Sequence, residues 1–159
     1  MESLGMEYSV EQIDPNLAQI LCREITADLP EYFGLPEVNE HYIQGMLTRT
    51  SFAIKIDQNY SGLLTLEFPY PQNANIYWMG IKEAYQDQGL GKALVRAASY
   101  FAANQGTHSL TVETLSPQEA NENYLNTYRF YEKCGFRPLF NLKPEGYKYS
   151  MVYMIFNFS

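Results

Sequence analysis

Two glycines and a lysine stand directly before a run of helix-forming residues in the segment QDQGLGKALV, residues 86–95. The first N–H groups of a helix have no partners within the helix, and the helix dipole places partial positive charge there. Glycines at this end let an anion approach the N–H groups without meeting a Cβ atom. We therefore expect an anion, such as a phosphate group, to bind at residues 88–92.

The spacing excludes two common phosphate-binding motifs. A nucleotide P-loop needs a glycine where Gln86 stands and a Ser or Thr where Ala93 stands. A dinucleotide-binding fingerprint needs a third glycine at the position of Leu94. The pattern that remains is Gln-x-x-Gly-x-Gly, formed by Gln86, Gly89 and Gly91.

The elements that must position this segment alternate between strand and helix. Residues 75–81, NIYWMGI, are apolar on both faces, as expected for a central strand. The helix after the glycines, residues 91–105, has the apolar spacing of an amphipathic helix, and a strand at 109–115 completes a strand–helix–strand crossover. The other predicted elements are strands at 7–13, 51–57, 62–68, 136–142 and 147–156, helices at 15–29, 39–47 and 121–134, and a hairpin turn at 58–61.

Length and composition indicate one folded domain spanning residues 1–159, because 46% of the residues are hydrophobic and only 18% are charged. The two cysteines and two histidines form no metal-ligand spacing, which predicts that no metal is bound. The chain has neither a run of 18 apolar residues nor a secretion signal, so we expect a cytoplasmic protein that does not enter a membrane. The net charge of −7 argues against nucleic-acid binding and suits a cationic substrate, although it also serves solubility.

Two segments in this order resemble the hallmarks of the GNAT superfamily of N-acetyltransferases. Residues 76–95, IYWMGIKEAYQDQGLGKALV, resemble its acetyl-CoA-binding segment, in which the Gln-x-x-Gly-x-Gly pattern follows a central strand. Residues 126–139, NTYRFYEKCGFRPL, resemble the end of a late helix in the same family. The resemblance covers residues 75–142, extends less firmly over 51–74, and is limited to element order in the first fifty residues.

The resemblance implies a fold and a cofactor. The fold is α+β, a mixed and mostly antiparallel seven-stranded sheet flanked by helices, whose fourth and fifth strands splay apart. Pantetheine would contact backbone groups of Met79 and Ile81, and the pyrophosphate of acetyl-CoA would rest on the first turn of the helix. The residues assigned to the cofactor on this basis are Met79, Ile81, Gln86, Gln88, Gly89, Leu90, Gly91, Lys92, Ala93, Asn123 and Tyr131.

Acetyl transfer from a thioester to an amine requires that the amine lose a proton and that the departing thiolate be protonated or stabilised. Tyr131 matches the tyrosine that serves many relatives as the acid toward the thiolate, although its residue type and neighbours also suit an ordinary core aromatic. Glu113 is the first candidate for the base and Glu67 the second, and a chain of water molecules is the alternative.

The acceptor is expected to be the primary amine of a small molecule, acetylated directly in a ternary complex. Tyr32 and Phe33, in the segment LPEYFGLPEV, are candidates for lid residues over the acceptor, and Glu67 is a further candidate contact. A polyamine, an aminoglycoside, an amino acid and a peptide all remain open. A non-catalytic acyl-CoA sensor and a protein or peptide N-acetyltransferase are the alternatives, and the strand-rich C-terminus offers an edge for a homodimer.

Overall fold

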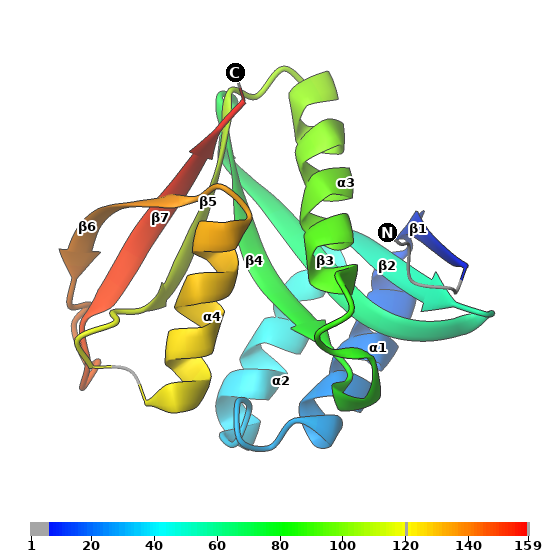
Figure 1. Cartoon of the computed structure of the whole chain (residues 1–159), viewed down its shortest axis with the longest axis horizontal. Helices are drawn as coiled ribbons and strands as arrows, with labels where there is room; N and C mark the ends of the chain where they lie inside the picture. The colour runs from blue at the N-terminus through cyan, green and yellow to red at the C-terminus, as the bar shows by residue number, and fades with distance from the viewer. Residues whose placement is uncertain (1–6, 120, 159) are drawn as a thin grey trace. The chain divides into compact units, whose positions relative to one another are not determined.

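The computed structural model describes residues 7–119 and 121–158, which form a sheet with helices packed on it (Figure 1). Its strands are β1 (Tyr8–Ile13), β2 (Thr50–Ile56), β3 (Asn59–Tyr70), β4 (Asn73–Ile81), β5 (Ser109–Leu115), β6 (Arg137–Leu142) and β7 (Met151–Asn157). Its α-helices are α1 (Pro15–Asp28), α2 (Pro36–Gly45), α3 (Leu90–Asn104) and α4 (Glu122–Lys133). Two 3₁₀ helices cover Met46–Thr48 and Glu83–Tyr85.

The strands form a seven-stranded sheet in the order β1-β2-β3-β4-β5-β7-β6. The pairs β1–β2, β2–β3, β5–β7 and β6–β7 are antiparallel, whereas β4 and β5 are parallel. The ladder between β4 and β5 ends at Ile76↔Val112, although both strands continue. The predicted α+β fold, with a mostly antiparallel sheet and an incompletely paired central pair of strands, is therefore confirmed.

The described residues form two compact units. The first contains the described residues up to Glu67 together with Tyr77–Tyr100, and the second contains Phe68–Ile76 and the described residues from Phe101 onward. Strands β3 and β4 and helix α3 contribute residues to both units. The single domain expected over residues 1–159 stays a prediction.

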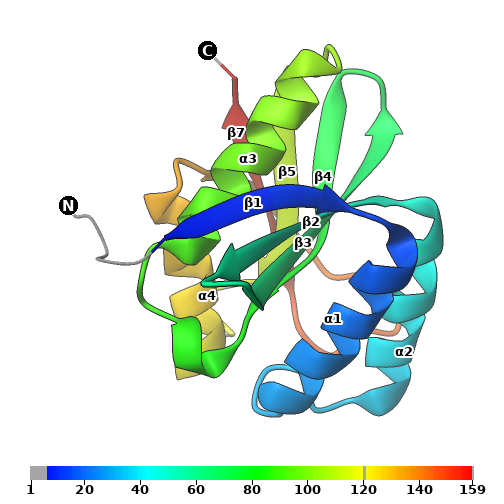
Figure 2. The ribbon, with the colours of Figure 1, turned by 90° about the vertical axis from the view of Figure 1, so that its right-hand side faces the viewer.

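The core of the first unit lies between the pair α1 and α2 and one face of its strands. Leu21 and Ile25 of α1 are buried in one cluster with Leu63 of β3 and Trp78 of β4. Because side chains alternate along a strand, Leu64 points to the opposite face, on which the first turns of α3 lie (Figure 2). The helices therefore hold this part of the sheet from both sides.

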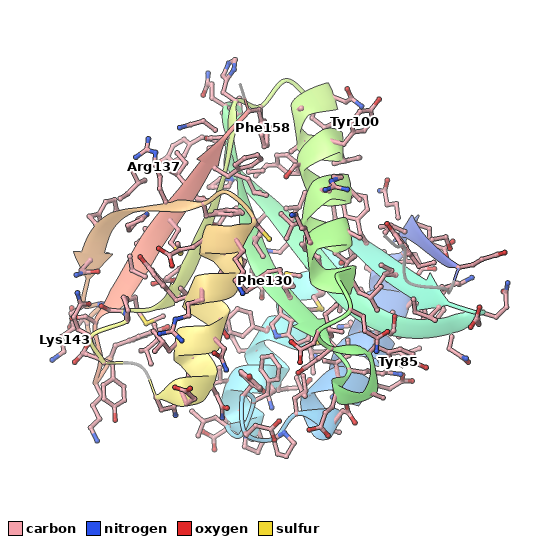
Figure 3. The ribbon with its side chains drawn as sticks, viewed as in Figure 1. Tyr85, Tyr100, Phe130, Arg137, Lys143 and Phe158 are labelled. Atoms are coloured by element: carbon pink, nitrogen blue, oxygen red, sulfur yellow. The ribbon has the colours of Figure 1, made fainter. Side chains whose placement is uncertain are left out.

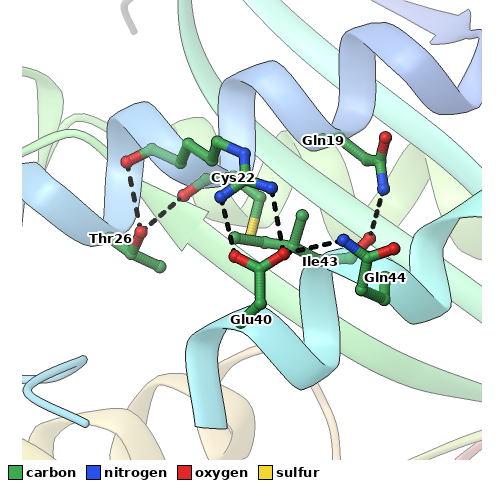
Figure 4. Close-up of polar contacts among 7 residues, drawn as sticks. Gln19, Cys22, Thr26, Glu40, Ile43 and Gln44 are labelled. Atoms are coloured by element: carbon green, nitrogen blue, oxygen red, sulfur yellow. Dashed lines mark hydrogen bonds and ion pairs between the residues drawn. The ribbon is translucent and has the colours of Figure 1, made fainter. Parts of the chain in front are cut away.

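Polar contacts join α1 to α2 (Figure 4). Arg23 donates from Nη1 and Nη2 to the two carboxylate oxygens of Glu40, at 2.7 and 3.0 Å. Gln44 Nε2 donates to Glu40 Oε2 at 2.7 Å, and Gln19 Nε2 donates to the carbonyl oxygen of Ile43 at 2.9 Å. The hydrogen bonds from Arg23 and Gln44 lower the pKa of Glu40 to about 2, so the carboxylate stays charged and paired over the physiological pH range.

Helix α2 begins at Pro36, so the predicted start at Asn39 is wrong. Proline suits a first helical turn because its missing N–H would have no partner there. Asn39 lies inside the helix, where its Nδ2 donates to the carbonyl oxygen of Phe33 at 2.8 Å. Its side chain therefore fixes the preceding loop instead of capping the helix.

The turn between β2 and β3 also differs from the prediction. Strand β3 begins at Asn59, and the turn is made by Asp57 and Gln58 with φ values of 47° and 75°. Two residues with positive φ form the tight hairpin turn that matches the twist of the flanking strands. The predicted turn at 58–61 is therefore wrong by about two residues, because side chains other than glycine adopt the left-handed conformation here.

In the second unit, α4 packs on the sheet formed by β5, β7, β6 and the first residues of β4 (Figure 1). Asn121 caps α4 by accepting a hydrogen bond from the backbone N–H of Tyr124 at 3.1 Å. Gly135, with φ of 102°, ends the helix.

Strand β6 is the edge strand and all six of its residues are exposed. Side chains project from its beginning at Arg137 and from Lys143 just beyond its end (Figure 3). The predicted homodimer along this edge stays a prediction.

Candidate active site

The glycine segment forms the connection from β4 to α3. Asp87 and Gly89 have φ values of 61° and 80°, so the backbone turns sharply just before the helix. The first helical hydrogen bond runs from Ala93 N to Gly89 O at 3.1 Å, which leaves the N–H groups of the first turn without partners inside the helix. A Cβ atom added at Gly89 would meet no other atom within 4 Å. The helix start is therefore open on the side of Gly89.

Two glutamines shape this turn. Gln86 Nε2 donates to the carbonyl oxygen of Ile81 at 2.9 Å, so the first residue of the Gln-x-x-Gly-x-Gly pattern ties the turn to the end of β4. Gln88 Nε2 donates to the carbonyl oxygen of Ala84 at 3.5 Å. Gln88 Oε1 is buried and has no hydrogen-bond partner among the residues that the structure describes. A buried acceptor of this kind is costly unless a water molecule or a ligand donates to it.

Helix α1 holds the other side of the same connection. Lys82 Nζ pairs with Glu24 at 2.9 Å, and the backbone N–H of Glu83 donates to Asp28 Oδ2 at 2.7 Å. The sequence does not indicate these two contacts, because Glu24 and Asp28 are more than fifty residues away from their partners and belong to no motif. They fix the backbone just before the glycine turn.

The backbone groups of Met79 and Ile81 face one edge of β4. Lys82 N donates to the carbonyl oxygen of Ser61 in β3 at 2.9 Å, so the backbone groups of Lys82 point toward β3. Neighbouring residues of a strand direct their backbone groups to opposite edges, so those of Ile81 and Met79 point away from β3. Since the carbonyl oxygen of Ile81 already accepts from Gln86, the backbone of Met79 is the better candidate to contact pantetheine.

The two predicted lid residues belong to the packed part of the first unit. The Phe33 ring stacks on Trp78 with centroids 5.1 Å apart and planes inclined by 30°, and Tyr32 packs against the same core. Their backbone N–H groups both donate to the carbonyl oxygen of Leu29. Burial, and to a smaller extent the charges of Glu31 and Asp87, raise the pKa of Tyr32. The contact with Trp78 gives Phe33 a packing role, whether or not it also covers an acceptor.

Glu67, the second candidate for the base, forms an ion pair. Its Oε1 lies 3.1 Å from both Nε and Nη2 of Arg49. The guanidinium carbon of Arg49 lies 4.0 Å from the centre of the Tyr77 ring, and its Nη1 donates to the carbonyl oxygen of Gly45 at 2.7 Å. A carboxylate that pairs with a stacked and hydrogen-bonded arginine is held by the fold. This network favours a structural role for Glu67.

Tyr131 lies in the second unit, near the end of α4. Only 6% of its surface is exposed, and its ring packs edge-to-face against Phe130 and Phe136 at 5.2 and 5.5 Å. Its carbonyl oxygen accepts from the backbone N–H groups of Cys134 and Phe136 in the turn that ends the helix. Burial raises the pKa of Tyr131, so its phenol stays protonated at neutral pH.

Glu113 is half-buried on β5 in the same unit. Its register partner on β7 is Tyr153, which acts on the Glu113 carboxylate as a hydrogen-bonding group. Burial raises the pKa of Glu113, and the hydrogen bond from Tyr153 opposes this effect. Asn123 is half-buried in the first turn of α4. The second unit therefore contains Glu113, Asn123 and Tyr131, and the first contains the other candidate residues.

Burial raises the pKa of the Cys22 thiol to about 12, which makes it a poor nucleophile. Within residues 7–119 and 121–158 no group of three or more His, Cys, Asp and Glu side chains could hold a metal ion. No helix in the same residues is long and apolar enough to cross a membrane.

The comparisons with solved structures show the fold. An acetyltransferase of the GNAT family from Desulfovibrio desulfuricans matches 95% of this chain and 99% of its own, with a TM-score of 0.79 and 19% identity. The ribosomal-protein-S18-alanine N-acetyltransferase of Escherichia coli matches 96% and 95%, with a TM-score of 0.76 and 14% identity. An aminoglycoside 6'-N-acetyltransferase solved with coenzyme A matches 94% and 96%, with a TM-score of 0.71 and 14% identity.

The comparison with family models identifies the family, whereas no curated protein matches the chain. The model described as the acetyltransferase (GNAT) family matches residues 18–136, which is most of the chain and includes the glycine turn, Glu113 and Tyr131. This match confirms the expected family and the expected enzyme class, an acyltransferase that uses acetyl-CoA. The chain therefore belongs to the acetyltransferase (GNAT) family.

Proposed function

We propose that this protein transfers the acetyl group of acetyl-CoA directly to the primary amine of a small molecule. The observation that carries the proposal is the open helix start at Gly89, where the N–H groups of Leu90, Gly91 and Lys92 precede the first helical hydrogen bond. Such a helix start suits a diphosphate, because unpaired N–H groups and the positive end of the helix dipole coincide there.

The residues of the first unit suit coenzyme A in three further respects. The buried and unpartnered Gln88 Oε1 can accept a hydrogen bond from a ligand. The backbone of Met79 faces away from β3 and suits a pantetheine amide. Lys92 lies in the first turn of α3 and is exposed, so its charge is available to a phosphate. The residues present therefore fit the cofactor.

Acetyl-CoA supplies an acetyl group that is activated as a thioester, and the protein must manage two protons. The amine is a nucleophile only after it has lost a proton, and Glu113 is the proposed acceptor of that proton, directly or through water. Tyr131 holds a phenolic proton at neutral pH and is the proposed donor to the thiolate sulfur. As the new C–N bond forms and the C–S bond breaks, the amine loses one proton and the sulfur gains one.

Titration with acetyl-CoA in an isothermal calorimeter tests the cofactor part of the proposal. We expect saturable binding of one acetyl-CoA per chain. The absence of any heat of binding at high micromolar acetyl-CoA would contradict the proposal.

An acceptor screen tests the reaction and separates it from the alternatives. Release of coenzyme A would be followed with a thiol reagent in the presence of spermidine, kanamycin, free amino acids and a peptide with a free N-terminus. We expect turnover with one or more of the small amines. Turnover with the peptide alone would favour a protein N-acetyltransferase, like the structurally similar enzyme named for ribosomal protein S18. Binding of acetyl-CoA without turnover on any acceptor would favour a sensor.

A further inference from the structure

Glu113 and Tyr153 form a cross-strand pair in the second unit. The two residues are directly opposite in the antiparallel ladder of β5 and β7, so their side chains project from the same face of the sheet. Tyr153 acts on the Glu113 carboxylate as a hydrogen-bonding group, which opposes the rise in the pKa of Glu113 that burial causes. Both residues are half-buried, which strengthens a hydrogen bond between them relative to one in water.

The edge strand holds the tyrosine ring from its other side. Phe140 of β6 is the register partner of Tyr153. The two rings have centroids 5.2 Å apart and planes inclined by 30°. Three neighbouring strands thus place a phenyl ring, a phenol and a carboxylate in one row. The tilted Phe140 ring packs against Tyr153 and restricts the rotation of the phenol beside Glu113.

The neighbours of Glu113 on this face are neutral. Toward β4, Thr111 Oγ1 lies 2.8 Å from Asn75 Oδ1 and accepts from Asn73 Nδ2 at 3.1 Å. Toward β7 and β6 the neighbours are Tyr153 and Phe140, and Tyr147 is the titratable group that acts on Tyr153 besides Glu113. Tyr153 is the group that favours the charged form of Glu113 and so lowers its pKa, against the effect of burial.

We propose that Tyr153 is a positioning residue, whose hydroxyl orients the Glu113 carboxylate and keeps it ready to accept the proton of the acceptor amine. The role of Glu113 rests on the proposed function, whereas the orientation by Tyr153 rests on the pairing of the strands. A base must be ionised and aimed at its proton to be effective. We expect Tyr153 to favour the ionised form of Glu113 and to orient its carboxylate, although β7 contains no recognised motif.

The first experiment measures the carboxyl group itself and needs no acceptor. The side-chain carboxyl signals of ¹³C-labelled protein would be followed against pH by NMR, with Glu113→Gln to assign the signal. We expect Glu113 to titrate at a higher pH in Tyr153→Phe than in the wild type, because the charged form loses its hydrogen bond. Tyr149→Phe, which removes an exposed phenol hydroxyl from the same unit, is the matched control and should leave the titration unchanged.

The second experiment measures the pH profile of kcat/KM with an amine that the wild type acetylates in the screen above. In Tyr153→Phe the acid limb should move to higher pH, so that kcat/KM is lost on the acid side of the profile and recovers well above the pKa of Glu113. The KM for acetyl-CoA should not change. A uniform loss at every pH would instead indicate a merely structural role.

The outcomes separate the two proposals. If no amine is acetylated by the wild type, the proposed function fails, while the NMR titration still tests the positioning. If the wild type is active and the Glu113 titration is the same in Tyr153→Phe, the positioning role is overturned. If the titration moves but the acid limb does not, Glu113 is not the base. Should Tyr153→Phe fail to fold, Phe140→Ala loosens the ring from an exposed edge and should shift the titration in the same direction.

Discussion

Gly89 has a left-handed backbone conformation, with φ of 80°, and open space where a Cβ atom would lie. In Gly89→Ala we expect a destabilisation of about 1 kcal/mol from backbone strain, together with a clear loss of affinity for acetyl-CoA, because the methyl group enters the space proposed for the diphosphate. Calorimetry with acetyl-CoA measures the affinity, and thermal unfolding measures the strain.

Gly106 provides the matched control. It also has a positive φ, of 92°, and open space around its missing Cβ, but it stands at the other end of α3. Gly106→Ala should carry the same strain and leave the affinity for acetyl-CoA unchanged. Equal losses of affinity in the two variants would contradict the assignment of the helix start to the cofactor.

The proposed acid is tested by removing one oxygen atom. Tyr131→Phe should lower kcat by about 100-fold, since a general acid contributes 10²–10⁴-fold, and should leave the affinity for acetyl-CoA nearly unchanged. Tyr128→Phe, one turn earlier on α4, controls for the loss of a phenol from this helix. If Tyr131→Phe keeps the kcat of the wild type, Tyr131 is not the acid and serves only as a core aromatic.

At the scale of elements, the link between α1 and α2 predicts a pH dependence of stability. The pKa of Glu40 is lowered to about 2 in the folded chain, so its pairing with Arg23 and Gln44 stabilises the fold above the ordinary pKa of a glutamate. This contribution decreases as the pH falls toward the folded pKa. The stability difference between the wild type and Glu40→Gln should therefore be largest near neutral pH and shrink between about pH 5 and 2, as measured by urea unfolding.

The loop between α1 and α2 gives a prediction that separates packing from substrate binding. In Phe33→Ala the loss of the stack on Trp78 should lower the free energy of unfolding by about 2 kcal/mol. If Phe33 also covers the acceptor, the KM for the amine should rise as well. Leu35→Ala, at an exposed position of the same loop, is the control and should alter neither quantity.

At the scale of the whole molecule, the chain is expected to unfold as one domain. Strands β3 and β4 and helix α3 run through both compact units, so neither unit can lose its structure without disturbing elements of the other. We expect a single calorimetric transition whose calorimetric and van't Hoff enthalpies agree. Two separate transitions would contradict the predicted single domain.

The sequence by itself determined the element order, the crossover around the glycines and the family. Apolar periodicity, Pro15, Asn121, Gly106 and Gly135 act through local backbone geometry, which a short window of sequence contains. The start of α2 was misplaced because Pro36 already begins the helix and Asn39 bonds to the carbonyl oxygen of Phe33 in the preceding loop. The β2–β3 turn was misplaced because Asp57 and Gln58 adopt positive φ.

Only the tertiary structure decided which side chains meet. It paired Glu67 with Arg49, anchored Lys82 and Glu83 to α1, stacked Phe33 on Trp78 and placed Tyr153 opposite Glu113. Each of these contacts joins residues far apart in the sequence, and strand register or helix packing brings them together. Strand register and helix packing are not encoded in a local sequence pattern, because both depend on how all the apolar faces of the chain are buried together.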